Sequence, residues 1–371
     1  MRFIATCKMG LESTVNFQLR RLGIEVVATE DARVVFEGGY DAMARALLWL
    51  RTAERVLMVA AEFPATSFDA LFEGTKRVDW KRYLRPDSNI HVNGKSAKST
   101  LFSVSDCQSI VKKAVVEKLR ESYRCTTIPE TGAEIIVEVG ILRDQVTLAL
   151  DCCGAGLSRR GYRTYNVPAP LSETLGAAVV LLSRFHADQP LIDPMCGSGT
   201  MPIEAAMIAE NRAPGLLRSF AAENWHFVEN AVWMQAREEA RDSIRKTKLQ
   251  ILGSDIDPHC IELCKKHAKK AGVMLDCAVR PLSEFSADAQ SSGVIVCNPP
   301  YGERLMDRKA VSELYREMRD TFLPFKHWSV NIITAFPEFE RVYGKRADKR
   351  RKLSNGGMTC QLYQYFREKS E

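Results

Sequence analysis

The chain has 371 residues, which suggests two or three domains, and its 46% hydrophobic and 26% charged residues are ordinary values for a globular protein. No apolar run approaches the ~20 residues that cross a bilayer, and residues 1–8 lack the apolar core of a secretory signal, so we expect neither a membrane nor a secreted protein. The formal net charge of +6 is compatible with a polyanionic partner but is a weak indication alone.

The front of the chain is predicted to form two small α+β units. For residues 1–60, the spacing of apolar residues predicts a strand at 3–7, a helix at 11–22, strands at 25–28 and 33–36, and a helix at 40–52. For residues 61–155 it predicts short helical segments at 68–74 and 80–84, a strand at 89–93, a helix at 105–123, and a hairpin of strands 134–142 and 145–151.

The rest of the chain predicts a parallel sheet behind a basic linker. The linker, 156–170, leads into a predicted helix at 171–185. From residue 190 onward strands alternate with helices, which is typical of parallel sheets. The predicted strands are 191–193, 251–255, 273–279, 294–298 and 329–334, and a last strand at 358–366, reached through a hairpin at 354–357, must be antiparallel. We expect the insertion 212–248 to be helical.

The most informative motif is Asn298-Pro299-Pro300-Tyr301, at the end of an apolar strand. The Asn298 side-chain carbonyl and the Pro299 backbone carbonyl can accept hydrogen bonds from a planar amine, and the prolines remove backbone donors from this tip. Tyr301 can stack on the ring that carries the amine. Pro-Pro also ends strands without any function, but a second motif favours a reaction site for methyl transfer to an exocyclic amine. Cys297, inside the strand, is expected to be a buried thiol.

That second motif is D-P-M-C-G-S-G-T, residues 193–200, a strand end followed by a glycine-rich turn and a helix. Its two glycines let the backbone approach a ligand, and Thr200 is expected to cap the helix. Asp193 suggests a nearby cation, such as the amino group of an amino acid. Asp255, at the tip of the next strand, can accept two ribose hydroxyls. Because the pattern departs from G-x-G-x-x-G, an adenosine that carries a methionine fits better than a pyrophosphate.

Together, DPMCGSGT, GSDIDP and NPPYGERL resemble the class I S-adenosylmethionine-dependent methyltransferases that modify exocyclic amines. Residues 61–155 resemble a THUMP RNA-binding domain, and 1–60 its ferredoxin-like companion. The chain is most similar to the THUMP-containing guanine-N2 methyltransferases of 23S ribosomal RNA. This resemblance implies an α/β fold in which domains 1–60 and 61–155 and a connecting segment, 156–189, precede a Rossmann-like methyltransferase domain, 190–371, with a mostly parallel seven-stranded sheet.

The resemblance also implies a cofactor and roles for single residues. The cofactor would be S-adenosyl-L-methionine, with the methionine end near the glycine turn, the ribose on Asp255 and the adenine against Ile256. The implied cofactor-binding residues are Asp193, Cys196, Gly197, Gly199, Thr200, Asp255, Ile256 and Asn298, and the catalytic ones are Asn298, Pro299 and Tyr301. Pro281 stands near the position where such families often have an Asp for the adenine amine, so no side chain is assigned to that contact.

Basic clusters outside the catalytic domain are candidates for binding RNA phosphates. They contain Lys95, Lys98, Ser99, Lys112, Lys113, Arg159, Arg160, Tyr162 and Arg163. The pair Lys112-Lys113 alone could equally be a solvated face, whereas the arginine cluster leads directly into the catalytic domain. A further basic run, 345–352, could bind phosphate or form a solvated hairpin arm.

The residues leave the substrate open. An adenine-N6 methyltransferase on RNA or DNA, a protein-glutamine methyltransferase and a non-catalytic RNA-binding ribosome assembly factor are the alternatives to a guanine-N2 enzyme. The basic clusters of the front half disfavour a protein substrate, and the intact glycines, Asp255 and Asn298 disfavour a catalytically inactive scaffold. We expect RNA as the partner, either ribosomal RNA or a pre-ribosomal particle.

Eleven cysteines, without a C-x-x-C pair, predict reduced thiols and a cytoplasmic location. Cys260, Cys264 and His267 share one face of a predicted helix, as part of a metal site would. A zinc site needs a second ligand pair, which the sequence lacks. We therefore expect an amphipathic helix there and no metal.

Overall fold

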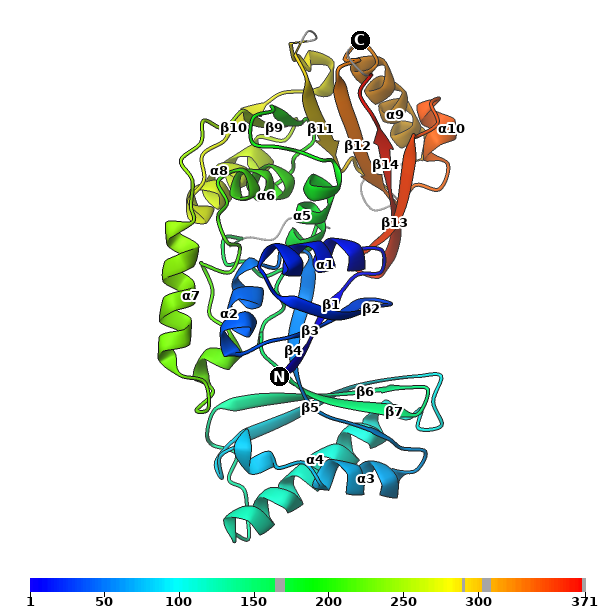
Figure 1. The fold of residues 1–371 in the computed structure, drawn as a ribbon. Coiled ribbons are helices and arrows are strands. Elements are labelled where there is room, and N and C mark those ends of the chain that lie inside the picture. Colours follow the sequence, from blue (N-terminus) through cyan, green and yellow to red (C-terminus); the bar gives the residue numbers. More distant parts are fainter. Residues whose placement is uncertain (164–170, 289–290, 302–307, 369–371) are drawn as a thin grey trace.

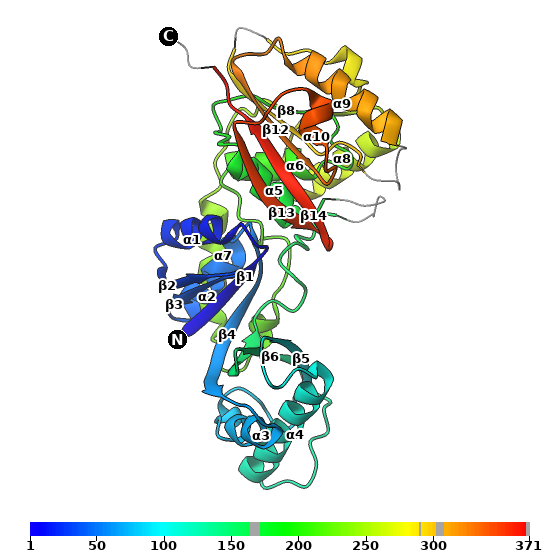
Figure 2. The ribbon, with the colours of Figure 1, turned by 90° about the vertical axis from the view of Figure 1, so that its right-hand side faces the viewer.

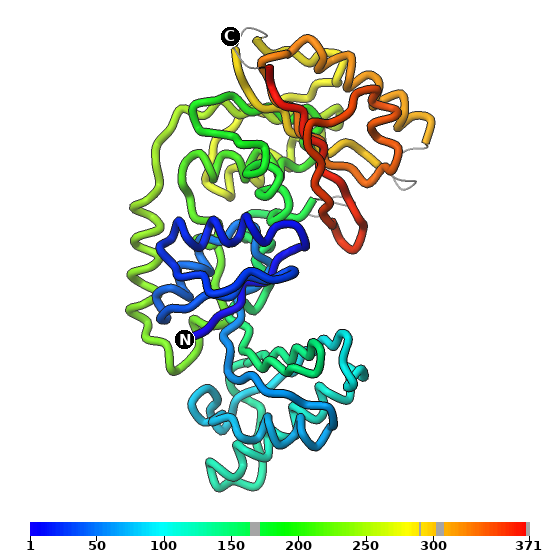
Figure 3. The backbone as a smooth tube through the Cα atoms, turned by 45° about the vertical axis from the view of Figure 1, so that its right-hand side comes forward, coloured from blue at the N-terminus to red at the C-terminus, as the bar shows by residue number. Residues whose placement is uncertain are grey.

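Two seven-stranded sheets organise the chain in the computed structural model, which describes residues 1–163, 171–288, 291–301 and 308–368 (Figure 1). The tube in Figure 3 shows an elongated molecule, with the end of the chain (orange and red) at one end and the cyan part of the front half at the other, while a yellow-green helical segment of the second half runs beside the blue N-terminal unit. None of the described helices is long and apolar enough to span a lipid bilayer.

The first sheet lies entirely in the front half of the chain. Its strands are β1 (Arg2–Cys7), β2 (Glu25–Glu30), β3 (Arg33–Glu37), β4 (Ala53–Pro64), β5 (Asn89–Ala97), β6 (Glu134–Leu142) and β7 (Gln145–Asp151), in the spatial order β2-β3-β1-β4-β7-β6-β5. Helices α1 (Glu12–Arg21) and α2 (Tyr40–Trp49) belong to its first part. Helix α3 (Phe68–Lys76), the 3-10 helix η1 (Trp80–Arg82) and helix α4 (Val104–Tyr123) belong to its second part.

Strand β4 joins the two expected front units into one sheet. It was not expected, because an apolar run without strict alternation does not distinguish a strand from the end of a helix. Its first half pairs with β1 (Leu57↔Ile4) and its second half with β7 (Phe63↔Val146). The expected boundary between residues 60 and 61 therefore falls inside a strand, which Figure 2 shows running from one unit into the other.

The second sheet has the order β10-β9-β8-β11-β12-β14-β13. Its strands are β8 (Leu191–Asp193), β9 (Ile251–Asp255), β10 (Asp276–Val279), β11 (Gly293–Cys297), β12 (Trp328–Thr334), β13 (Lys349–Asn355) and β14 (Met358–Tyr365). The first five strands in this order are parallel, and β14 is antiparallel to both β12 and β13, as the Asn-Gly-Gly hairpin predicts.

Both faces of this sheet are covered, which explains the unbroken apolar sequence of its central strands. In β11, Val294 and Val296 join the core that contains helices α5 (Glu173–Leu182) and α6 (Thr200–Ala209). Ile295 and Cys297 join the opposite core, with helices α9 (Arg308–Phe322) and α10 (Phe339–Tyr343). The 3-10 helix η3 (Leu282–Glu284) contributes Leu282 to the second core, and helix α8 (Pro258–Ala271) packs beside α6.

The insertion 212–248 is helical only in part, as η2 (Ala221–Asn224) and α7 (Asn230–Asp242). Its remaining residues fasten the catalytic half to the front half. The Gly215 amide donates to the Leu48 carbonyl at 2.9 Å, and the Ala222 amide donates to the Cys152 carbonyl at 3.1 Å. Figure 1 shows α7 beside α2. These non-local backbone contacts take the place of the continuous helix that was expected.

Candidate active site

The polar residues singled out in the sequence lie at one edge of the second sheet. Strand β8 pairs in parallel with β9 (Asp193↔Gly253) and with β11 (Ile192↔Ile295), so the carboxyl ends of the three strands meet. The crossover from β8 leads to β9 on one side, whereas the crossover from β11 leads to β12 on the opposite side. Open α/β sheets bind ligands at such a point, where the strand order reverses. The tips that carry Asp193, Asp255 and Asn298 therefore open onto the same side, as the sequence predicts.

The glycine loop, residues 194–199, is fastened to the neighbouring elements by hydrogen bonds. The Cys196 amide donates to the Ser254 carbonyl at 2.9 Å, and the Gly197 amide donates to Asp255 Oδ2 at 2.9 Å. On the helix side, His267 Nδ1 lies 3.1 Å from the Ser198 carbonyl oxygen, so the ring must donate its proton there. The loop is thus preorganised between β9 and α8.

The two glycines of this loop serve different ends. Both have positive φ, +53° at Gly197 and +88° at Gly199. A Cβ at Gly199 would lie 2.4 Å from the Cys264 sulfur, whereas a Cβ at Gly197 would meet nothing within 4 Å. Gly199 therefore permits close packing on α8, and Gly197 leaves an open backbone surface for a ligand.

The expectation that Thr200 caps α6 is wrong. Gly199 occupies the N-cap position, and a glycine has no side chain with which to bond the free amides of the first turn. The left-handed turn at Gly199 starts the helix one residue earlier than a threonine cap would. The Thr200 hydroxyl instead accepts a hydrogen bond from Arg163 Nη2 at 2.6 Å, and the residue is only 6% exposed.

Asp193 is fully buried and only half satisfied. Its Oδ1 accepts from the Met195 amide at 3.2 Å, and its Oδ2 has no partner among the described residues. Burial raises the pKa of this carboxyl well above its usual value, the Met195 amide opposes the shift, and the nearby Asp255 charge adds to it. A buried carboxylate with a free oxygen fits an incoming ammonium group, such as that of a methionine moiety.

The carboxylate of Asp255 is oriented by two backbone amides. Oδ2 accepts from Gly197, and Oδ1 accepts from the Asp257 amide at 3.0 Å. Each oxygen keeps a lone pair, which suits two hydroxyls of a ribose. Ile256, the next residue, is 72% exposed, and a flat apolar ring could cover it. Cys196 is buried with its sulfur near Gly253, and its backbone amide and carbonyl are bonded to Ser254 and Gly199.

The tip of β11 presents an unpaired acceptor. Asn298 Oδ1 is buried without a hydrogen-bond partner among the described residues. Behind it, the Tyr315 hydroxyl lies 3.3 Å from the Pro300 carbonyl, to which it donates, and 2.8 Å from the Thr334 hydroxyl. Tyr315 on α9 thus holds the proline turn in place, a role that its sequence does not signal.

Tyr301 is held at its hydroxyl end. The hydroxyl accepts from Asn355 Nδ2 at 3.3 Å, and the Cys360 sulfur lies 4.0 Å away. Both partners belong to the β13–β14 hairpin, and burial raises the pKa of the Tyr301 phenol. The sequence does not predict this contact of Asn355, because an Asn-Gly-Gly pattern is expected in a hairpin turn whether or not the asparagine has another role.

The candidate RNA-binding residues divide into exposed and buried ones. Lys95, Lys98, Lys113 and Arg159 are exposed. Lys112 forms an ion pair with Glu130 at 3.0 Å, and the Ser99 hydroxyl is used internally by Ala97 and Asp144. The remaining three members of the arginine cluster point inward: Arg160, Tyr162 and Arg163.

Arg160 and Tyr162 do not fit the expected RNA contact. They are only 2% and 1% exposed, and both contact the carboxylate of Glu204, at 3.3 Å and 3.4 Å. A charge run in the sequence does not reveal a buried counter-charge on a distant helix, and these two expectations are corrected here.

The thiols belong to the cores. All eleven cysteines are unpaired, Cys297 is fully buried, and burial raises the pKa of its thiol. Cys264 packs under the glycine loop with its sulfur 3.3 Å from that of Cys277. Within the described ranges, no three His, Cys, Asp or Glu side chains converge as metal ligands would.

Comparison with family models assigns all three parts of the chain. Residues 2–57 match the RlmL ferredoxin-like domain, 65–151 the THUMP domain, and 160–364 the RMKL-like methyltransferase domain. The chain is 44% identical over 368 residues to the "Putative RNA methyltransferase YpsC" of Bacillus subtilis (strain 168), covering 98% of this chain and 95% of that protein.

A second relative is longer. The chain is 34% identical over 387 residues to the "Ribosomal RNA large subunit methyltransferase K/L" of Syntrophotalea carbinolica, covering 98% of this chain but 53% of that protein, so it spans about half the length of this relative.

Two solved structures have nearly the same fold. A "predicted N6-adenine-specific DNA methylase" from Listeria monocytogenes superposes with a TM-score of 0.93 at 47% identity, covering 99% of this chain and 96% of the other. SMU.472, described as a putative methyltransferase complexed with SAH, superposes with a TM-score of 0.93 at 40% identity, covering 100% and 99%. The site and the three matched regions agree: the chain belongs to the family of the RMKL-like methyltransferase domain, with a ferredoxin-like and a THUMP domain in front of it.

Proposed function

We propose that the protein uses S-adenosylmethionine to methylate the exocyclic N2 amine of a guanine in 23S ribosomal RNA. The observation that carries the proposal is a pair of buried acceptors at neighbouring strand tips, Asp193 Oδ2 and Asn298 Oδ1, which have no partner in the part of the chain that the structure describes. One suits the ammonium group of the cofactor and the other suits the amine of the substrate. The THUMP domain and the relative named for large-subunit ribosomal RNA support the choice of RNA.

The donor set fits this cofactor. Asp193 would hold the ammonium group, the open backbone at Gly197 would lie along the methionine, and Asp255 would hold the ribose hydroxyls. Bound there, S-adenosylmethionine supplies a methyl group already activated by its sulfonium. What remains for the protein is to orient a weak nucleophile toward it and to exclude water.

Asn298 and Pro299 would orient that nucleophile. A base amine is planar because its lone pair is delocalised into the ring. When Asn298 Oδ1 and the Pro299 carbonyl accept hydrogen bonds from its two N–H groups, the nitrogen is held with its lone pair directed at the methyl group. The nitrogen becomes cationic on methylation and loses a proton readily, so a neutral amide suffices at this position.

Tyr301 would stack on the target base, an interaction of about 1–3 kcal/mol. Its ring is set by the Asn355 bond to its hydroxyl, so the plane of the base would be fixed before chemistry. The base amines of a duplex are paired, so the target must be unpaired or turned out of its helix. The exposed Lys95, Lys98, Lys113 and Arg159 would hold the phosphates of the flanking strand.

Adenine N6 is the second candidate for the methylated atom. The Listeria monocytogenes structure bears the name of an N6-adenine methylase, and an amide-proline tip can accept the amine of either base. The RNA-type module and a relative named for ribosomal RNA favour RNA over DNA as the substrate. We favour guanine over adenine because the sequence motifs resemble those of the guanine-N2 methyltransferases of ribosomal RNA. A location in the cytoplasm, on ribosomal RNA or a pre-ribosomal particle, agrees with eleven free thiols.

Nucleoside analysis of ribosomal RNA tests the proposal. RNA from a deletion strain should lack one N2-methylguanosine, which returns with the wild-type gene but not with an Asn298→Ala gene. Loss of N6-methyladenosine alone would establish the second candidate. Unchanged nucleosides, together with no binding of S-adenosylmethionine in a titration, would instead identify a non-catalytic assembly factor.

A further inference from the structure

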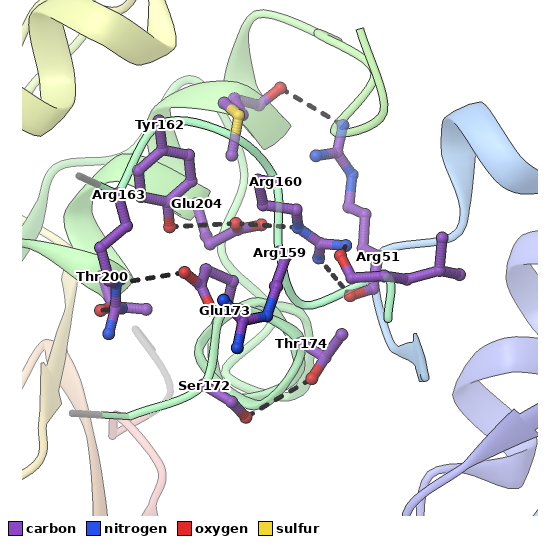
Figure 4. Close-up of polar contacts among 12 residues, drawn as sticks. Arg51, Arg159, Arg160, Tyr162, Arg163, Ser172, Glu173, Thr174, Thr200 and Glu204 are labelled. Atoms are coloured by element: carbon purple, nitrogen blue, oxygen red, sulfur yellow. Dashed lines mark hydrogen bonds and ion pairs between the residues drawn. The ribbon is translucent and has the colours of Figure 1, made fainter. Parts of the chain in front are cut away.

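Apart from the exposed Arg159, the arginine cluster of the linker is turned inward against the catalytic domain (Figure 4). Arg160 and Arg163 come from the segment that connects the RNA-binding module to the second sheet. Both contact α6, the helix that begins at the end of the glycine loop. Two arginines that the sequence suggests as RNA-phosphate ligands therefore contact the helix next to the candidate cofactor site.

Arg163 lies between the starts of two helices. Its Nη2 donates to the Thr200 hydroxyl at 2.6 Å and to the Leu171 carbonyl at 3.1 Å. Its Nε lies 3.1 Å from Glu173 Oε1 at the start of α5, and the two side chains are 12% and 10% exposed. Nε forms this ion pair without a hydrogen bond to any of the described residues, so two hydrogen bonds and one ion pair hold the guanidinium in a nearly dry setting.

The position of Thr200 matters because it directly follows Gly199. The rest of the loop is tied to β9 by Cys196 and Gly197 and to α8 by Ser198. The Arg163 bond holds the last point of the loop, where the free amides of the first turn of α6 begin. A shift of this turn would displace the loop that lies along the cofactor.

One turn further along α6, Glu204 forms a second contact between this helix and the linker. Its fully buried carboxylate accepts from Arg160 Nε, while Arg160 Nη1 donates to the Leu157 carbonyl at 2.8 Å and Nη2 donates to the Arg51 carbonyl. Arg51, just after α2, donates in turn to the Arg212 carbonyl at 2.7 Å. The linker is therefore clamped to both halves of the molecule.

We propose that Arg163 is a positioning residue for the cofactor. Through Thr200 it fixes the first turn of α6 and the end of the glycine loop, and the linker that carries it ties this position to the RNA-binding module. The inference rests on the proposed function only in taking S-adenosylmethionine and its demethylated product as the ligands.

Calorimetric titration of the full chain with S-adenosylhomocysteine tests the inference without any RNA. Thr200→Val keeps the shape and removes the acceptor, and we expect affinity to fall ~5- to 10-fold, within the range of a typical net hydrogen-bond contribution. Thr200→Ser keeps the hydroxyl and should stay within about twofold of the wild type. Arg163→Gln should match the valine variant. Unchanged affinity in Arg163→Gln would overturn the inference.

The double variant separates positioning from direct contact. If Arg163 acts through Thr200, then Arg163→Gln with Thr200→Val should bind no more weakly than either single variant. Losses that multiply would mean that the two residues act independently and would refute the inference. Arg241→Gln, on the exposed face of α7, is the matched control for loss of an arginine.

Two further readouts distinguish the possible failures. If a lowered thermal midpoint shows that Arg163→Gln is too unstable to test, the isosteric Thr200→Val remains the test. Unchanged S-adenosylhomocysteine affinity in Thr200→Val would then refute the inference. In methylation assays, Arg163→Gln should raise KM for S-adenosylmethionine and leave kcat at saturating cofactor within about twofold.

A wild-type protein that binds cofactor but methylates no ribosomal RNA would refute the proposed function and leave the binding result standing. A wild-type protein that binds neither ligand would refute both.

Discussion

The backbone amide of Gly197 donates to the carboxylate of Asp255 across 2.9 Å, which joins the glycine loop after β8 to the tip of β9. Two motifs that are 58 residues apart in the chain thereby become one surface. The bond orients the carboxylate before any ligand arrives, so cofactor binding requires little rearrangement there. The loop is also bonded to Ser254 and His267. A substitution at any one of these three partners should therefore change the affinity for the cofactor.

Asn298→Ala should lower the single-turnover rate of methyl transfer by about 100-fold or more, because it removes a preorganised acceptor at the reacting amine. Affinities for S-adenosylhomocysteine and for ribosomal RNA should change by less than about threefold. Asn16→Ala, on the surface of α1, is the control, and a near-normal rate in Asn298→Ala would refute the assigned role.

Gly199→Ala should destabilise the protein more than Gly356→Ala does. Both positions have positive φ, so both variants pay about 1–2 kcal/mol for a left-handed alanine. Only at Gly199 does the new Cβ collide with Cys264, which adds about 1–3 kcal/mol of overpacking. Urea unfolding measures the difference, and equal losses at the two positions would contradict the packing seen here.

Gly197→Ala separates ligand contact from stability. A Cβ there meets no protein atom within 4 Å, so its stability cost should resemble that of Gly356→Ala. Its affinity for S-adenosylmethionine should nevertheless fall at least ~10-fold, because the methyl group would occupy the surface on which the cofactor lies. Unaltered binding would show that the cofactor does not lie against this backbone.

Asp193→Asn should stabilise the ligand-free protein at neutral pH while weakening cofactor binding. The raised folded-state pKa means that the wild-type carboxyl contributes its stability fully below its unfolded value of 3.8 and loses it as pH rises through the folded value. Asparagine does not titrate, so the advantage of the variant should grow from pH 4 to pH 8. Parallel stability curves over that range in urea unfolding would contradict the buried carboxyl.

Asn355→Ala and Tyr301→Phe should lower kcat on ribosomal RNA by the same factor, about three- to tenfold, because each removes one side of the same hydrogen bond. The double variant should be no worse than either single one. Cofactor affinity should be unchanged in all three. Independent, multiplying losses would show that the hairpin acts on turnover by a route other than Tyr301.

Much of the site is predictable because its motifs are local. The strand ends at Asp193, Asp255 and Asn298 are each marked by an apolar run that stops at a polar or proline residue, and the rule that parallel strands share an edge then brings them together. The β6–β7 hairpin and the final antiparallel strand follow from turn residues in the same way.

Other features depend on partners that local patterns do not record. β4 was missed because pairing along its length, with β1 and then β7, is what makes it one strand. Arg160 looks like an exposed cation until Glu204, 44 residues later, is folded against it. Asn355 looks like a turn residue until Tyr301, 54 residues earlier, meets it.

The amino-acid sequence by itself determined the chemistry available: acceptors at strand tips, glycines where the backbone bends, and local clusters of lysine and arginine. Tertiary structure alone decided which arginines are buried, which residue orients Tyr301 and how the front half is joined to the catalytic sheet. The physical reason is the distance along the sequence over which each interaction acts. Turns, caps and strand periodicity are set by neighbours within a few residues, whereas burial and the pairing of charges depend on groups that only folding brings within 3–4 Å.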